Sequence, residues 1–298
     1  MTGWTDEVIV NIMNDSVIVN IMNDSVTKIG KSILQHGKYN DRIYLMKLSH
    51  EDFPEIIDII EKLAKVEGYS KIFAKIPEYA KDEFIKNGYL VEAAIPGFFK
   101  GQEGVYFLGK YFAGSRKIDN KIEEINTILN IALSKKNEIM ELSLPPGFNY
   151  KICDKSNVFQ MADLYRKVFD TYPFPIFDPE YILKTMDENF IYSSIWKNDK
   201  IVALSSCEMD SGAQNVEMTD FATLPEYGGK GLAIFLLHNM EHEMRKRNIK
   251  TSYTISRAVS YGINIIFAKM GYEYCGTLVK NTNISGNFES MNVWYKFL

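Results

Sequence analysis

The sequence predicts an α/β (α+β) fold with a mixed central sheet, and three observations indicate it. Strand-like and helical segments alternate through the second half of the 298-residue chain, as they do in layered α/β proteins. The first half repeats that alternation more faintly. Between the halves, Pro145, Pro146 and Gly147 end a helical run and open a turn, which leaves two parts that each have the size of one domain.

The elements of the second half follow one another at short spacing. In chain order we predict a strand at 150–153, helices at 156–170 and 179–187, strands at 190–197 and 200–208, a strand that runs into a glycine loop and a helix, a strand at 252–255, a helix at 260–269, and closing strands at 274–279 and 289–297. The helix at 260–269 has its apolar residues on one face, and Gly271 stands where a C-cap glycine belongs.

The first half contains a matching series of segments. A helix is predicted at 120–142, before the two prolines. Further upstream, Phe84–Tyr89 parallels Phe267–Tyr272, and two strands follow each of these segments. We interpret residues 27–146 as a degenerate copy of the fold in residues 147–298, with chance similarity as the alternative.

The start of the chain holds an exact duplication. Val8–Val17 recurs as Val17–Val26, and two copies are too few for a repeat protein. Asn and Asp interrupt the apolar run and no basic segment precedes it, so it does not resemble a signal peptide. We expect residues 1–26 to have no function of their own.

Composition argues against several classes of function. The formal net charge of −4 disfavours a nucleic-acid partner, whose phosphates would select a basic face. No run of about 18 apolar residues is present, so no membrane span is expected. The three cysteines, Cys153, Cys207 and Cys275, are few and odd in number, which suits a reducing cytoplasm. The oligomeric state stays open, with a homodimer as one option.

The most informative segment runs from Thr219 to Met240 and is typical of a strand, a glycine loop and a helix. Gly228, Gly229 and Gly231 allow a sharp turn that presents backbone N–H groups, and the helix aims its positive end at the same point. Such a loop holds a phosphate or pyrophosphate, the alternative being a plain strand-to-helix turn. The spacing fits neither a P-loop nor a dinucleotide-binding fingerprint.

Within this segment, Pro225–Ala233 resembles the acyl-CoA pyrophosphate loop of the GNAT acetyltransferases, written Arg/Gln-x-x-Gly-x-Gly/Ala. The family's leading Arg or Gln falls on Gly228, so that side-chain contact is missing here. Lys269–Tyr272 is similar to the end of the family's second conserved helix. The resemblance implies a GNAT acyltransferase fold with acetyl-CoA as co-substrate. It implies acetyl-CoA contacts from the strand and the loop, namely Phe221, Ala222, Thr223, Gly229, Lys230, Gly231, Leu232, Ala233 and Ile234.

The first half is then a degenerate GNAT-like domain. It has no glycine phosphate loop between Leu63 and Ile72, so we expect it to bind no CoA and to shape the substrate cleft or an interface.

Acetyl transfer to an amine needs a base. An alkylammonium has a pKa of about 10.4, so the neutral amine costs about 4.6 kcal/mol at pH 7. A carboxylate must take the proton, and we favour Asp220 over Glu217, with Glu208 on the neighbouring strand. Strand alternation predicts that Asp220 and Glu217 point to opposite faces. A backbone N–H near Ala222 or Thr223 would polarise the thioester carbonyl.

The acid that protonates the leaving thiolate stays open. Much of the family uses a tyrosine at a position that holds Phe267 here. Either Tyr261 takes this role or the thiolate, with a reference pKa of about 8.5, leaves without a dedicated acid. No metal is expected: His238–His242 spells the H-x-x-E-H pattern of some zinc proteases, but the two histidines flank a buried helical stripe and no third ligand is visible.

Several motifs outside the loop resemble the β-lysine N-acetyltransferases. They include Met218–Pro225, Ile95–Phe99 and Asn281–Gly286, and the resemblance extends over nearly the whole chain from Met22. It implies transfer to the ε-amine of β-lysine, giving N6-acetyl-β-lysine, a compatible solute.

The substrate itself predicts further contacts, because β-lysine carries two ammonium groups and a carboxylate. Acids would meet the amines, and the fork of Arg257 would bind the carboxylate, unless Arg257 belongs to a structural ion pair. The substrate contacts we predict are Glu208, Arg257, Asn264 and Glu289. The alternatives are a GNAT enzyme for another diamine, a polyamine or a protein amine, and a non-catalytic acyl-CoA sensor.

Overall fold

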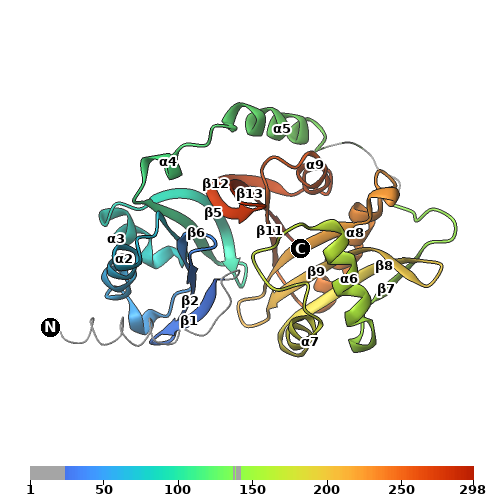
Figure 1. Ribbon diagram of the computed structural model, residues 1–298, viewed down its shortest axis with the longest axis horizontal. Helices are drawn as coiled ribbons and strands as arrows, with labels where there is room; N and C mark the ends of the chain where they lie inside the picture. Colours follow the sequence, from blue (N-terminus) through green and yellow to red (C-terminus); the bar gives the residue numbers. More distant parts are fainter. Residues whose placement is uncertain (1–23, 137, 139–141) are drawn as a thin grey trace. The chain divides into compact units, whose positions relative to one another are not determined.

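The computed structural model describes residues 24–136, 138 and 142–298, which form two compact units (Figure 1). The first unit comprises residues 24–96, Glu103–Asn120 and Gly276–Met291, and the second comprises Gly97–Gln102, Lys121–Cys275 and Asn292–Leu298. Each unit is therefore assembled from pieces that are distant in the sequence. The predicted domain boundary after residue 146 stays a prediction.

The second unit contains a mixed sheet, as predicted. Its strands are β7 (Asn149–Ile152), β8 (Phe190–Lys197), β9 (Lys200–Asp210), β10 (Asn215–Thr223), β11 (Thr251–Arg257) and the part of β13 (Asn287–Phe297) that begins at Asn292. Strands β7 to β10 pair antiparallel in chain order, β10 pairs parallel with β11, and β13 follows β11. Helix α8 (Leu232–Lys246) connects β10 to β11, because a parallel pair needs a crossover.

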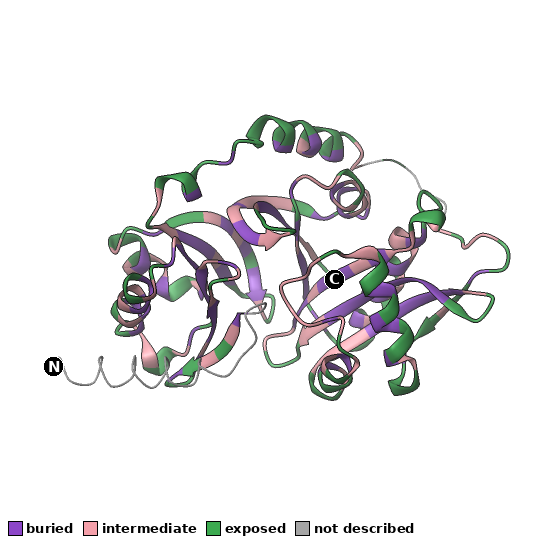
Figure 2. Ribbon diagram, viewed as in Figure 1, coloured by how far each residue is buried: buried purple, intermediate pink, exposed green. Residues whose placement is uncertain are grey.

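Helices cover both faces of this sheet. On β9, Ala203 belongs to the core cluster that contains α8, whereas the next residue, Leu204, belongs to the cluster that contains α6. Successive side chains of a strand point to opposite faces, so the two clusters lie on opposite sides. One face carries α6 (Val158–Val168) and α7 (Pro179–Glu188), and the other carries α5 (Ile122–Ser134), α8 and α9 (Tyr261–Lys269). Figure 2 shows much of the central strands β8 to β10 in the buried colour and much of α6 and α7 in the exposed colour.

Several boundaries differ from the sequence prediction. Helix α5 ends at Ser134, where the Lys135 N–H bonds to the Ala132 carbonyl, rather than continuing to 142, because the sequence turns polar there. Residues 137 and 139–141 of the predicted helix lie outside the described residues. The closing strands β12 (Glu273–Ile284) and β13 are longer than predicted.

The first unit has its own set of strands and helices and its own core. Its elements are β1 (Ser25–Ile29), β2 (Ser32–Gly37), β3 (Arg42–Lys47), α2 (Ile56–Glu67), β4 (Lys71–Pro77), α3 (Lys81–Lys86), β5 (Leu90–Phe99), β6 (Glu103–Tyr111), α4 (Gly114–Lys117) and most of β12. The short 3₁₀ turns of the chain are η2 (His50–Asp52), η3 (Glu78–Ala80), η4 (Lys155–Asn157) and η5 (Pro225–Tyr227). Ile56, Ile60 and Leu63 of α2 are buried in a core that also contains residues of β3 and β4.

The strand order of the first unit repeats that of the second. The first series runs in the order β1-β2-β3-β4-β6-β5, and the second runs in the order β8-β9-β10-β11-β13-β12. In each series the last two strands are neighbours in both the sequence and the sheet, and they appear in reversed order. In both series a helix connects the third strand to a parallel fourth, α2 in one and α8 in the other. This agreement supports our interpretation of the first half as a degenerate copy.

The repeat also corrects where a phosphate loop would lie in the first half. The segment equivalent to the glycine loop is 48–55, between β3 and α2, and not 63–72, which precedes β4. Segment 48–55 has no glycine. The Asp52 carboxylate occupies it and accepts hydrogen bonds from the backbone N–H groups of Lys31 at 2.9 Å and Ser32 at 2.7 Å. An acidic segment of this kind repels phosphate.

The end of the N-terminal duplication is part of the first unit. Strand β1 begins at Ser25, and the buried carboxylate of Asp24 accepts a hydrogen bond from the Asn40 side chain at 2.7 Å. Residues 1–23, which hold the rest of the duplication, lie outside the described residues.

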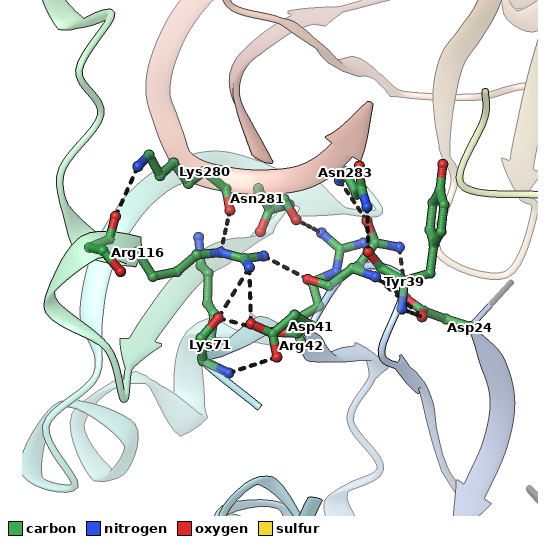
Figure 3. Close-up of polar contacts among 12 residues, drawn as sticks. Asp24, Tyr39, Asp41, Arg42, Lys71, Arg116, Lys280, Asn281 and Asn283 are labelled. Atoms are coloured by element: carbon green, nitrogen blue, oxygen red, sulfur yellow. Dashed lines mark hydrogen bonds and ion pairs between the residues drawn. The ribbon is translucent and has the colours of Figure 1, made fainter. Parts of the chain in front are cut away.

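Buried cations fix β12 within the first unit (Figure 3). Arg116 donates to the carbonyls of Lys280 at 2.8 Å and Asn40 at 2.7 Å, and Arg42 donates to the Asn281 carbonyl. Lys71 is completely buried, and its ammonium bonds to the Glu92 carboxylate at 2.9 Å and to the Val279 carbonyl at 2.8 Å. Burial lowers the pKa of Lys71 to about 8 although Glu92 opposes this shift. This network has the properties of a structural polar core.

In the parts of the chain that the structure describes, no helix is both long and apolar enough to cross a membrane.

Candidate active site

The glycine loop has the conformation that an anion site requires. Gly229 and Gly231 have φ angles of 72° and 73°, in the left-handed region that L side chains rarely adopt. A Cβ at Gly229 would meet nothing within 4 Å, so the backbone conformation, and not lack of space, demands glycine there.

Six consecutive backbone N–H groups of this loop are available to a ligand. Among the described residues, the N–H groups from Gly229 to Ile234 have no hydrogen-bond acceptor, and the first bond of α8 runs from the Phe235 N–H to the Gly231 carbonyl at 3.1 Å. Gly231, the N-cap of α8, has no side chain to cap them. Free N–H groups at a helix N-terminus, where the dipole is positive, form an anion site. The arrangement therefore fits the pyrophosphate of acetyl-CoA.

Strands β10 and β11 separate next to this loop. Their parallel pairing covers only Asn215–Glu217 and Thr251–Tyr253, although β10 continues to Thr223 and β11 to Arg257. Beyond the pairing, the β10 edge that faces β11 has backbone groups with no partner strand among the described residues. A chain-like ligand can hydrogen-bond to such an edge as an additional strand would.

One N–H group at this edge can be identified. The Leu224 N–H bonds to the Val202 carbonyl at 3.0 Å, so the backbone N–H of Leu224 points toward β9. Because backbone groups alternate along a strand, the Thr223 N–H points away from β9, toward the separated edge. The same alternation directs the Ala222 N–H to β9. Of the two predicted donors for a thioester carbonyl, the geometry favours Thr223.

A β-bulge displaces Asp220 from the regular alternation. Thr219 lies opposite Ser206 and Ala222 opposite Leu204, so Asp220 and Phe221 together face a single residue of β9. The φ angle of Asp220 is 55°, a left-handed conformation that Asp tolerates better than most residues.

The predicted separation of the two carboxylates was therefore wrong. Val216 and Met218 lie in the core cluster of α8, so Glu217 points to the other face, the face of α6 and α7. The Ser205 hydroxyl contacts Met240 of α8, so Ser205 points to the face of α8. The next residue, Ser206, points to the opposite face, and it is Ser206 that bonds to Asp220. Asp220 thus lies on the same face as Glu217, because the bulge adds one residue to the alternation.

Hydroxyl groups from three directions hold the Asp220 carboxylate. Tyr172 donates to Oδ1, Ser206 donates to Oδ2, and Thr219 donates to Oδ1 at 3.4 Å. Asp220 is 7% exposed, and burial raises the pKa of its carboxyl while these three hydrogen bonds oppose the shift. A carboxylate with a raised pKa is a better base near neutral pH.

Further acids and tyrosines line the same face. Glu208 of β9 lies directly opposite Glu217 of β10. Burial raises the pKa of Tyr181 on α7, and the charges of Asp220 and Glu208 add to this effect. The face is therefore acidic and aromatic, which suits a cationic amine.

The structure changes the assignment of one predicted substrate residue, Asn264, and leaves those of Arg257 and Glu289 untested. Asn264 is completely buried and fully bonded within the protein: its amide donates to the carbonyls of Arg257 and Ser260 and accepts from Asn292 and Trp294 at 2.7–3.0 Å. We therefore correct its assignment from substrate contact to structural support. Arg257 is exposed at the end of β11, and its substrate role stays a prediction. Glu289 belongs to the first unit, and its role likewise stays a prediction.

The acid for the thiolate is still open. Phe267 is completely buried and packs edge-on against Phe221, with ring centroids 5.6 Å apart, and against Tyr272 at 4.8 Å. Tyr261 begins α9 and is 47% exposed. Phe267 is thus a core residue, and Tyr261 keeps the solvent access that a proton donor needs.

The His238–His242 motif has a structural explanation. The Glu241 carboxylate is buried and bonds to the Lys296 ammonium at 2.9 Å and to Arg245 at 3.0 Å. Across residues 24–136, 138 and 142–298, no group of three or more His, Cys, Asp or Glu residues is arranged to hold a metal ion.

Sequence reasoning missed Tyr172 and Ser206. Tyr172 lies in the proline- and aromatic-rich segment 169–178 between α6 and α7, which has no catalytic pattern. Ser206 follows Ser205 between the apolar residues 201–204 and Cys207 of β9. A buried polar pair in a strand interior was the available signal, because such groups need hydrogen-bond partners.

The family and the relatives that this chain matches are all acetyltransferases. Residues 158–272 match the family described as Acetyltransferase (GNAT) family. The chain is 45% identical to the β-lysine N(6)-acetyltransferase of Methanococcus maripaludis, over 91% of this chain and 98% of that protein. It is 33% identical to the β-lysine N(6)-acetyltransferase of Methanosarcina mazei, over 83% of this chain and 98% of that protein. It is 30% identical to the N-acetyltransferase YodP of Bacillus subtilis, over 90% of this chain and 96% of that protein.

Proposed function

The chain belongs to the GNAT family of acetyltransferases, and on this basis we propose that it transfers the acetyl group of acetyl-CoA to the ε-amine of β-lysine. Two relatives with 45% and 33% identity are β-lysine N(6)-acetyltransferases. The observation that carries the proposal is the buried Asp220 carboxylate on the bulge of β10, beside the edge where β10 and β11 separate.

The glycine loop and the separated edge would hold the co-substrate. The N–H groups from Gly229 to Ile234 would bind its pyrophosphate, and Phe221, Ala222 and Thr223 would line its path along β10. Each hydrogen bond to a charged group contributes about 1.5–3 kcal/mol, so several backbone donors can compensate for the missing side chain at Gly228. When bound, acetyl-CoA supplies the acetyl group as a thioester.

The residues of this chain would handle the proton and the developing charge. Asp220 would accept the proton of the substrate ammonium and leave a neutral amine that can attack the thioester carbonyl. Thr223 would donate its N–H to the carbonyl oxygen as negative charge develops there. Glu208 and Glu217, on the same face, would attract the cationic substrate. As the C–N bond forms and the C–S bond breaks, the attacking nitrogen releases its second proton to solvent, and the departing thiolate takes a proton from Tyr261 or from solvent.

We extend the proposal to the setting of the reaction. The product, N6-acetyl-β-lysine, would serve as a compatible solute, and the enzyme would act in the cytoplasm without a nucleic-acid, membrane or metal partner, as a monomer or a homodimer. Size-exclusion chromatography with light scattering would decide between the two oligomeric states.

A thiol-release assay with acetyl-CoA tests the function. The panel is β-lysine, α-lysine, spermidine and a peptide amine, and the variant is Asp220→Asn. Asn tolerates the left-handed φ of 55°, whereas Ala would add backbone strain to the loss of the carboxylate. We expect turnover on β-lysine above the other amines, reduced about 100-fold or more in the variant. Turnover only on another amine would reassign the substrate, and CoA binding without any turnover would favour the sensor.

A further inference from the structure

Tyr172 contacts the proposed base from outside the sheet. It lies in segment 169–178, between α6 and α7, and its hydroxyl donates to Oδ1 of Asp220. Ser206, on the neighbouring strand β9, donates to the other oxygen. The two oxygens of one carboxylate are thus held by two separate elements. Charge-assisted bonds of this type are stronger than neutral ones and fix direction as well as charge.

Aromatic packing fixes the position of Tyr172. Its ring lies 5.0 Å from that of Phe169, which stacks on Tyr165 of α6 with centroids 6.0 Å apart. Arg166 of α6 anchors the end of the segment through a hydrogen bond to the Phe177 carbonyl. The placement of the Tyr172 hydroxyl therefore depends on the packing of this segment against α6.

A second observation indicates a polar ligand or a water molecule beside Asp220. Tyr165 is completely buried, and its hydroxyl has no hydrogen-bond partner among the described residues. Burial raises the pKa of Tyr165, and the nearby charge of Asp220 is the next cause. Buried hydroxyls are nearly always hydrogen-bonded, so the Tyr165 hydroxyl points to a polar atom that completes the site when the substrate or water is present.

We propose that Tyr172 is a positioning residue for the acetyl transfer, which holds the Asp220 carboxylate ionised and oriented and thereby couples segment 169–178 to proton removal. This inference rests on the proposed function of Asp220. The groups that face Asp220 from the surrounding elements are Tyr165 of α6, Tyr181 of α7, Tyr192 of β8, Glu208 of β9 and Glu217 of β10.

The sign of the effect follows from the hydrogen bond. A donor to the ionised form favours that form, so the Tyr172 bond lowers the pKa of Asp220 against the larger effect of burial. Removing the hydroxyl should raise the pKa of Asp220, by about 1 unit for the loss of one such bond. The acidic limb of the pH profile should then move to higher pH.

The test is Tyr172→Phe beside the matched control Tyr192→Phe. Tyr192 is a buried tyrosine close enough to sense the charge of Asp220, but its hydroxyl bonds to Thr185 at 2.8 Å. ¹³C NMR titration of labelled aspartates reports the pKa of Asp220, with Asp220→Asn for assignment, and the pH profile of kcat/KM for β-lysine reports the same group in the reaction. We expect Tyr172→Phe to raise both the pKa of Asp220 in the titration and the midpoint of the acidic limb of kcat/KM by about 1 pH unit. On the acidic limb, this shift corresponds to a roughly tenfold loss of rate. Tyr192→Phe should move neither.

Substituting 3-fluorotyrosine at position 172 keeps the shape of the side chain and makes the hydroxyl a stronger donor. It should move the pKa of Asp220 downward, and it keeps the test valid if Tyr172→Phe does not fold. An unmoved pKa in both Tyr172 variants, or an equal shift in Tyr192→Phe, overturns the proposal. The titration needs no turnover, so an inactive wild type would contradict the proposed function while the titration still decides the role of Tyr172.

Discussion

Gly228 stands where GNAT proteins carry an arginine or glutamine, and replacing it with arginine should strengthen CoA binding. The backbone angles of Gly228 are φ −58° and ψ 153°, which any L residue adopts. The position is exposed, so a long side chain has room to reach the N–H groups of the loop. A new Cβ would lie 3.1 Å from the Pro225 carbonyl oxygen, which requires a small shift of the backbone.

The magnitude follows from two opposing terms. A hydrogen bond from the guanidinium to a phosphate contributes about 1.5–3 kcal/mol. Ordering the arginine side chain costs up to about 2 kcal/mol. The net gain is about 1 kcal/mol, and since 1.4 kcal/mol is a tenfold change, the Kd for CoA should fall roughly fivefold. The gain should shrink at high salt, because the position is exposed.

Isothermal titration calorimetry of Gly228→Arg with CoA measures this change. Gly228→Ala is the control, because it introduces the Cβ and its contact with Pro225 without the charge. Pantetheine, which lacks the pyrophosphate, should bind all three proteins equally. If Gly228→Arg binds CoA no more tightly than Gly228→Ala at low salt, position 228 does not face the pyrophosphate, and the assignment of the loop is wrong.

Three further predictions test the loop, the base and the first unit. Gly231→Ala, at φ 73°, should weaken CoA binding by roughly tenfold, because the left-handed conformation costs Ala about 1–2 kcal/mol; in calorimetry Gly262→Ala on α9, with φ in the ordinary range and open space around it, should change nothing. At pH values above the raised pKa of Asp220, the wild type must bury a charge, so Asp220→Asn should have a higher Tm than the wild type. At pH values below the ordinary carboxyl pKa of 3.8, the two Tm values should be equal. A Tm difference that persists at low pH in scanning calorimetry would contradict this origin. Glu92→Gln should lower the free energy of unfolding in urea by about 3–5 kcal/mol, because it removes the counter-charge of the buried Lys71, whereas Glu51→Gln breaks an exposed pair and should have little effect; equal losses would refute the structural role of the buried pair.

The loop and the order of elements were accessible to sequence reasoning, because both depend on local rules. Gly229 and Gly231 occupy the positions that need positive φ, and the apolar faces of the helices follow the helical period. The strand order β8 to β11 follows from short connections and from the crossover helix that a parallel pair needs.

The arrangement around Asp220 was not accessible in the same way. A bulge adds one residue to a strand without a distinct sequence signal, and here it reverses the face of Asp220 relative to the simple alternation. Tyr172 reaches Asp220 from a segment 48 positions away, a tertiary contact that no local pattern encodes. Asn264 shows the opposite error, because a polar residue that looked available is fully bonded inside the protein.

The most direct measurement of the central claim is the identity of the product formed from acetyl-CoA and β-lysine. Mass spectrometry with fragmentation locates the acetyl group, and a parallel thiol assay counts the CoA released. The account predicts one monoacetylated product, modified on the ε-amine, with one CoA released per product and strong suppression in Asp220→Asn. Acetylation of the other amine, an unchanged rate in Asp220→Asn, or CoA binding without any acetylated product would contradict it.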